Sequence, residues 1–290
     1  MINPKLSELA DKITKWCDSE PTIKNYATIK QELLSRLNSN NPEDSVVGSA
    51  LLFGDLACFK RAQGVKEALL GNNTSSIQMI VEAGMETVVT IRSILNFKKS
   101  RCLETEIINT SGALLAALCT TIFINDKENM RWLVQEILEG PERYDAWFDD
   151  NEYLSSMIYL LAKSTLEGSI VGDKDVELHP ICQSLFTASG RDETENAMLA
   201  CCEYRFDRAY KSQSKVLDDE FVSVEIAGFP FEILAFEKLY NQFNNARLAV
   251  EHDCILPSFR KVFEQKVPKR GELASKILDA SIALNKGAGR

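Results

Sequence analysis

Carboxylates in one short acidic segment are the residues most suited to chemistry in this sequence. Asp145, Asp149 and Glu152 recur at spacings of four and three, so on a helix they would share one face. Carboxylates grouped in this way can hold a divalent cation or share a proton. A metal-dependent enzyme that uses these acids is therefore one function that the sequence allows. Acids on a surface helix are more often a solvated face, and we predict no catalytic residue and no metal ligand here.

Recognition of a partner is the better use for these acids. Side chains that flank turns are presented to partners, and acidic side chains attract a basic surface and raise its association rate. Acids that serve only solubility are the open alternative. The residues of this predicted acidic surface are Asp145, Asp149, Asp150, Glu152, Asp218, Asp219 and Glu220.

Histidine and cysteine side chains offer a second kind of chemistry. The pairs His179-x-x-Cys182 and His252-x-Cys254 carry the nitrogen and sulfur atoms that zinc binds. The pairs lie about seventy residues apart, and neither spacing is a strong zinc signature, so we expect unrelated loop histidines near buried thiols. A Cys254 nucleophile activated by His252 is equally unexpected, because residues two apart on an extended chain rarely touch. The sequence names no third residue that would orient such a base.

Composition and motifs argue against several other classes. The net charge is −9, from 42 acidic and 33 basic residues, and such a chain repels nucleic acid unless its bases gather on one face. The bases of the segment Lys261–Arg290 are spread at helical spacing without interleaved aromatic residues, which is typical of a solvated helix face. Dinucleotide, P-loop and kinase signatures are absent from the sequence. We predict neither a cofactor nor a nucleic-acid partner.

Cysteine usage and apolar runs indicate the compartment. None of the eight cysteines forms a CxxC pair, and most lie within apolar helical patterns, as expected for free thiols in a reducing cytosol. The first residues do not have the pattern of a signal peptide. The uncharged run Gly112–Ile124 has 13 residues, whereas a bilayer requires about 20. We therefore expect a cytoplasmic protein with no membrane partner.

The same uncharged run is the element around which the others must pack. A helix that is apolar on every side has to be enclosed by other elements, so Gly112–Ile124 should be a buried central helix. Apolar stripes at helical spacing and start signals such as Asn3-Pro4 predict about a dozen helices in an all-α fold, with a solenoid-like array of hairpins left open. We expect one domain, 1–290, with a candidate subdomain hinge near 169–178. At most one short strand pair is expected, from Phe221–Ile226 and Leu248–His252.

Two segments in this order resemble a known family. The first is SALLFGDLACFKRAQGVKEALLG, and the second is GFPFEILAFEKLYNQFNNARLAVEHDCILPSFRKVF. Together they cover about a fifth of the chain and look like bacterial polymorphic-toxin immunity proteins of the large all-helical type. The resemblance rests on apolar patterning and not on a catalytic motif. It implies a cytoplasmic protein that binds a cognate toxin, often one delivered by type VI secretion or by contact-dependent systems.

Three functions follow in order of preference. The first is an immunity protein, not an enzyme, that blocks the active site of a toxin by covering a basic surface with its acidic one. The second is an α-solenoid scaffold or regulator that binds a peptide or helix in a groove. The third is a metal-dependent enzyme that uses the clustered carboxylates. The family's contact residues vary with the toxin, so the resemblance assigns none to this sequence.

Overall fold

The computed structural model describes residues 3–38, 42–71, 73–101, 111–139, 152–214 and 223–287. These residues form thirteen helices and no strand, which confirms the predicted all-α fold. In the described part of the chain, no helix has both the length and the apolar character that a membrane span requires. The helices are α1 (Pro4–Asp18), α2 (Glu20–Leu37), α3 (Pro42–Leu69), α4 (Asn73–Arg101), α5 (Ser111–Phe123), α6 (Lys127–Leu138), α8 (Tyr153–Glu167), α9 (Pro180–Thr187), α10 (Arg191–Ser214), α11 (Val224–Gly228), α12 (Phe231–Asn244), the 3₁₀-helix η1 (Phe259–Glu264) and α13 (Glu272–Gly287).

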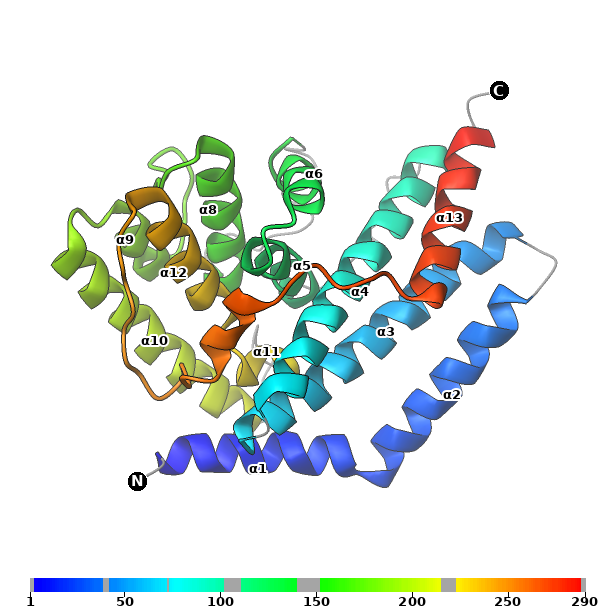
Figure 1. Ribbon diagram of the computed structural model, residues 1–290, viewed down its shortest axis with the longest axis horizontal. Coiled ribbons are helices and arrows are strands. Elements are labelled where there is room, and N and C mark those ends of the chain that lie inside the picture. The colour runs from blue at the N-terminus through cyan, green and yellow to red at the C-terminus, as the bar shows by residue number, and fades with distance from the viewer. Residues whose placement is uncertain are drawn as a thin grey trace.

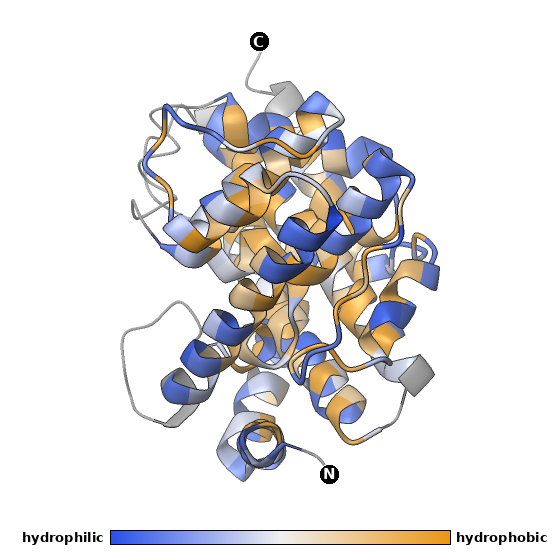
Figure 2. Cartoon of the chain, turned by 90° about the vertical axis from the view of Figure 1, so that its left-hand side faces the viewer, coloured by the Kyte–Doolittle hydropathy of each residue, from blue (hydrophilic) through white to orange (hydrophobic). Residues whose placement is uncertain are grey.

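Helix α5 is the buried central helix that its composition predicts. Every residue from Leu114 to Phe123 is buried. Helices α4, α6, α8 and α12 all pack against it, and it lies near the middle of the molecule in Figure 1. Gly84 lets α4 approach α5 closely, because a Cβ at this position would come within 2.0 Å of Thr120 Oγ1. The hydrophobic stretches of the chain accordingly lie mostly towards the inside of the helical array, and the hydrophilic ones towards its outside (Figure 2).

Local signals in the sequence set several helix ends. Asn3 accepts a hydrogen bond from the backbone N–H of Lys5, and Pro4 begins α1, as the start signal predicts. The region of the expected strand Phe221–Ile226 is described from residue 223 onward, and there the prediction of a strand is wrong, because Val224–Gly228 forms α11. Six alternating residues are too few to distinguish a short buried helix from a strand.

The last helix packs beside early helices of the chain on one side of the molecule. Helix α13 packs against α4 and α3, and α2 packs against α3 (Figure 1). A small second core joins these four helices through residues that include Leu33, Phe53, Val89 and Ile277. The remaining helices share the large core around α5. The segment between η1 and α13 therefore crosses from one core to the other.

Buried ion pairs connect segments that are distant in sequence. Arg61 of α3 lies 3.3 Å from Glu225 of α11, and the Nε of Arg205 lies 2.7 Å from Glu232. Arg205 also donates hydrogen bonds to three backbone carbonyls between residues 226 and 229. These contacts neutralise buried charges and satisfy carbonyl groups around the short helix α11.

The expected hinge region is a non-helical connection from α8 to α9. Asp173, which is buried, accepts hydrogen bonds from Tyr159 and from Lys163 of α8. The hydroxyl of Ser164 accepts a further bond from the N–H of Val171. The connection is thus held to α8 at several points, and its role as a hinge remains a prediction.

Candidate functional site

The predicted acidic surface falls mostly outside the described residues. This applies to Asp145, Asp149, Asp150, Asp218, Asp219 and Glu220. Glu152 is described: it is partly buried, directly precedes α8, and its carboxylate accepts a hydrogen bond of 3.5 Å from Ser155 Oγ. A carboxylate at a helix N-terminus interacts favourably with the helix dipole, so Glu152 has a local structural role.

The histidine and cysteine of the first candidate pair serve packing. His179 lies against two aromatic rings, with its ring centroid 4.8 Å from that of Tyr204 and 5.8 Å from that of Tyr153. Burial and the nearby charge of Arg208 lower the pKa of His179. The sulfur of Cys182 points to the backbone carbonyl of Tyr153 at 3.5 Å. The structure does not join this pair to His252 and Cys254 as one set of four zinc ligands.

The second candidate pair makes the contact that sequence reasoning considered improbable. His252 Nδ1 lies 3.1 Å from Cys254 Sγ, and the backbone N–H of Cys254 also donates to this nitrogen. A turn explains the contact, because the N–H of Ile255 donates to the carbonyl of His252 at 2.9 Å. The expectation of an extended chain at this point is therefore wrong. The turn folds the backbone so that a thiol and an imidazole two residues apart face each other.

Helix α10 adds two further residues to this pair. Cys202 lies so that its sulfur, the sulfur of Cys254 and a ring nitrogen of His252 are all within 4.8 Å of one another. The carboxylate of Glu203 lies 3.2 Å from His252 Nε2 and supplies the orienting residue that the sequence did not identify. We call these four residues the thiol–imidazole cluster. About fifty residues separate its two halves, and no local pattern links them.

Electrostatic interactions within the cluster favour the charged forms of His252 and Cys254. The hydrogen bond to Cys254 raises the pKa of His252 to about 8, although burial opposes this rise. The hydrogen bond with Cys202 lowers the pKa of Cys254; burial opposes this fall, and His252 reinforces it. The pKa of Cys202 moves in the opposite direction, because its hydrogen bond with Cys254 and the burial of its sulfur both raise it. Of the two thiols, Cys254 is therefore the one that loses its proton more readily.

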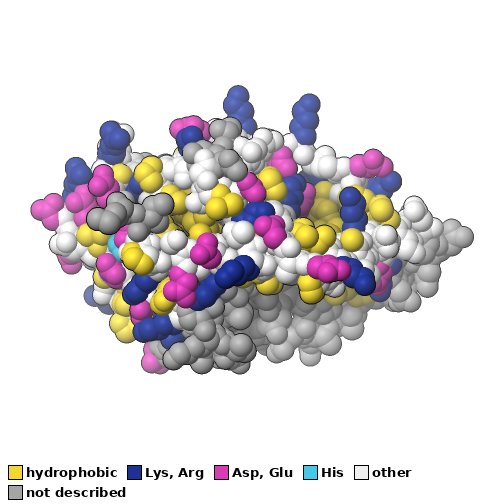
Figure 3. Space-filling model, turned by 90° about the horizontal axis from the view of Figure 1, so that it is seen from below, with side chains coloured by type: hydrophobic (Ala, Val, Ile, Leu, Met, Phe, Trp, Pro, Cys, Tyr) yellow, Lys and Arg dark blue, Asp and Glu magenta, His cyan; other side chains and the backbone are white. Residues whose placement is uncertain are grey.

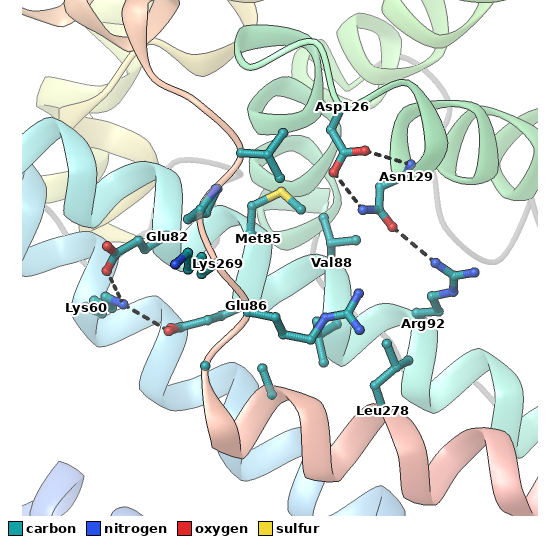
Figure 4. A pocket seen from close by; sticks show the side chains of 16 residues that line it. Lys60, Glu82, Met85, Glu86, Val88, Arg92, Asp126, Asn129, Lys269 and Leu278 are labelled. Carbon is teal, nitrogen blue, oxygen red and sulfur yellow. Dashed lines mark hydrogen bonds and ion pairs between the residues drawn. The ribbon is translucent and has the colours of Figure 1, made fainter.

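A pocket of about 280 Å³ lies between α3, α4 and the segment that leads into α13. Figure 4 shows this segment passing over α4, with Lys60, Glu82 and Glu86 joined by ion pairs on one side of the pocket. On the other side, Asn129 connects Arg92 to Asp126, the residue that caps α6. Valine, leucine and methionine side chains form the apolar part of the wall.

Comparison with protein families, with curated proteins and with solved structures finds no match to this chain. The fold defines the class as an all-α protein, and any function has to be argued from its surfaces and clusters.

Proposed function

We propose that this chain is a binding protein of the immunity type, which neutralises a toxin by covering its active site with an acidic surface. The observation that supports the proposal is the distribution of the negative charge along the chain. The buried arginines, Arg61 and Arg205, are each neutralised by a buried glutamate, Glu225 and Glu232. The net charge of −9 therefore belongs to the rest of the chain, which includes the acidic segments around residues 142–152 and 218–220.

Charge of this kind suits an inhibitor of a basic active site. A toxin that attacks nucleic acid or a nucleotide commonly has a basic cleft, and an acidic protein is drawn to such a cleft by long-range attraction. Acidic and basic side chains alternate on the face seen in Figure 3, so that face is not the single-sign surface that the proposal requires. The resemblance to immunity proteins supports the same function.

Coexpression with the product of the gene directly upstream tests the proposal. We expect the two proteins to copurify, with an association rate that falls as salt concentration rises. The double variant Asp149→Lys plus Asp150→Lys should weaken binding. The matched control is Asp11→Lys plus Asp279→Lys, two exposed acids in α1 and α13 that give the same change in net charge. Equal binding by both double variants and the wild type would exclude these acids from the interface.

The pocket favours a second candidate, a helical scaffold that accepts a segment of a partner. Val88, Val89 and Leu278 supply an apolar wall, while Lys269 and Arg270 place two exposed cations at the edge. These groups suit a peptide in which an acidic side chain follows an apolar one. The volume is just below the roughly 300–1,000 Å³ of pockets for drug-sized ligands, so a short segment fits better than a whole helix.

A photoreactive residue at the pocket tests this second candidate. Val267 is 51% exposed at the pocket edge, and Leu166 is 61% exposed at the end of α8 and provides the control position. Crosslinking of an acidic peptide at position 267 but not at 166 would support the scaffold. Equal crosslinking at both positions would count against it.

A further inference from the structure

We infer that Cys202, His252 and Cys254 form a zinc-binding site, which does not depend on toxin binding. The three ligand atoms lie within 4.8 Å of one another. Two thiolates and one imidazole are the ligands that zinc prefers among side chains. The site lies between α10 and the loop that follows α12, so a bound ion would fasten this loop to the helix.

The distances suit a zinc ion after a small adjustment. Zinc bonds of about 2.3 Å to sulfur and 2.0–2.1 Å to nitrogen place those two atoms about 3.5 Å apart in a tetrahedral site. The distance from His252 Nδ1 to Cys254 Sγ is 3.1 Å. The atoms would have to separate by about 0.4 Å, which side-chain rotation can supply.

Hydrogen bonding already sets the imidazole for this role. Nδ1 accepts from the backbone N–H of Cys254, so this nitrogen is unprotonated in that contact, and zinc would take its single lone pair in place of the hydrogen bond. Nε2 faces the carboxylate of Glu203 at 3.2 Å. A histidine that binds a metal with one nitrogen commonly donates the other N–H to a carboxylate, which fixes the tautomer and increases the basicity of the ligand.

Burial favours the two sulfurs as a specific pair of ligands. Cys202 is 0% exposed and Cys254 is 5% exposed. Cys201, the neighbour of Cys202 in α10, directs its sulfur to the carbonyl of Ile181 at 3.8 Å, so it is not one of the three ligands. Binding exchanges protons for metal, because the cluster releases two protons, one from Cys202 and one from the Cys254–His252 pair, as Zn²⁺ forms two Zn–S bonds and one Zn–N bond. The described residues supply three ligands, and a tetrahedral zinc ion takes a fourth.

Cobalt titration of the full chain, reduced and stripped of metal, tests the inference. We expect one Co²⁺ per chain, an absorption band from charge transfer between thiolate and cobalt, and displacement of Co²⁺ by Zn²⁺. The variants Cys202→Ser and Cys254→Ser should each lose most of this band, whereas the matched control Cys201→Ser should keep it. Glu203→Ala should weaken affinity about 10–100-fold.

X-ray absorption at the zinc edge of the wild-type chain provides a measurement that does not depend on whether variants fold. Two sulfurs at about 2.3 Å and nitrogen or oxygen at about 2.0–2.1 Å would support the site. A zinc shell without sulfur, a Co²⁺ band that survives both serine substitutions, or no metal binding by the reduced chain would each overturn the inference. Exclusive recovery of a Cys202–Cys254 disulfide under reducing conditions would overturn it as well.

Discussion

The carboxylate of Glu203 and the imidazole of His252 lie 3.2 Å apart although they come from a long helix and from a loop 49 positions further along the chain. This contact fixes one nitrogen of the ring and directs the other to the sulfur of Cys254. The thiol of Cys254, the imidazole of His252 and the carboxylate of Glu203 thus contact one another in series, an arrangement that can bind metal or activate a thiol. The cluster is the strongest candidate for chemistry among the described residues.

Arg260 should couple the stability of the loop to metal affinity. Its Nε and Nη2 each lie 2.8 Å from the Glu237 carboxylate, and Nη2 also donates to the carbonyl of Val250, two residues before His252. Lysine cannot reproduce this forked contact, so Arg260→Lys should cost about 1 kcal/mol of unfolding free energy. It should also weaken Co²⁺ binding without removing a ligand. Arg247→Lys, an exposed change in the same loop, is the control in both measurements.

Leu118 should be essential to the stability of the central helix. Its side chain is fully buried in α5, so Leu118→Ala should lower the free energy of unfolding by about 2–5 kcal/mol through lost burial and a cavity. The same substitution at Leu166, which is 61% exposed, should cost less than about 0.5 kcal/mol. Chemical denaturation of both variants measures the difference. Similar losses would mean that α5 is not enclosed.

Removal of Glu232 should leave a buried charge without its partner. Glu232→Leu should destabilise the fold by about 3–5 kcal/mol, because Arg205 would keep its charge in an apolar interior. The double variant with Arg205→Met should recover part of this loss. Recovery should be incomplete, since Arg205 also donates to backbone carbonyls next to α11. The unfolding free energies of the two single variants and of the double variant measure this coupling. If the two single losses simply add up in the double variant, Glu232 and Arg205 are not coupled and the prediction is wrong.

Asp173 should make stability depend on pH in the acid range. Burial alone would raise the pKa of Asp173, but hydrogen bonds from Lys163 and Tyr159 outweigh it and lower the pKa. A carboxyl group with a lowered pKa in the folded state contributes stability that is full above its unfolded pKa of about 4 and is lost as pH falls through the folded pKa. The advantage of the wild type over Asp173→Asn should therefore be constant near neutral pH and shrink below about pH 4.

An exposed acid close by supplies the control for this pH dependence. The side chain of Asp175 is exposed, and Asp175→Asn should change the free energy of unfolding little at any pH. Thermal or denaturant unfolding from pH 2 to 7 gives both comparisons. An advantage that grows as the solution becomes more acidic would contradict the assigned direction of the shift.

Features that depend on neighbouring residues were predictable from the sequence. The run from Leu114 to Phe123 lacks charges, so its burial follows from composition, and the caps at Asn3 and Asp126 are set within three residues of the chain. The strand expected at Phe221–Ile226 shows the limit of this reasoning, because a short apolar stretch fits either a strand or a buried helical turn.

By itself, the sequence determined the all-α class, the enclosed central helix and an excess of acidic residues, because periodicity, capping and charge are encoded locally or in composition. Only the tertiary structure decided that Cys202, and not Cys182, would meet His252 and Cys254. That choice depends on how α10 packs beside the loop after α12 and on the turn that brings His252 against Cys254. Such distances result from packing over the whole core, and no spacing along the chain reports them.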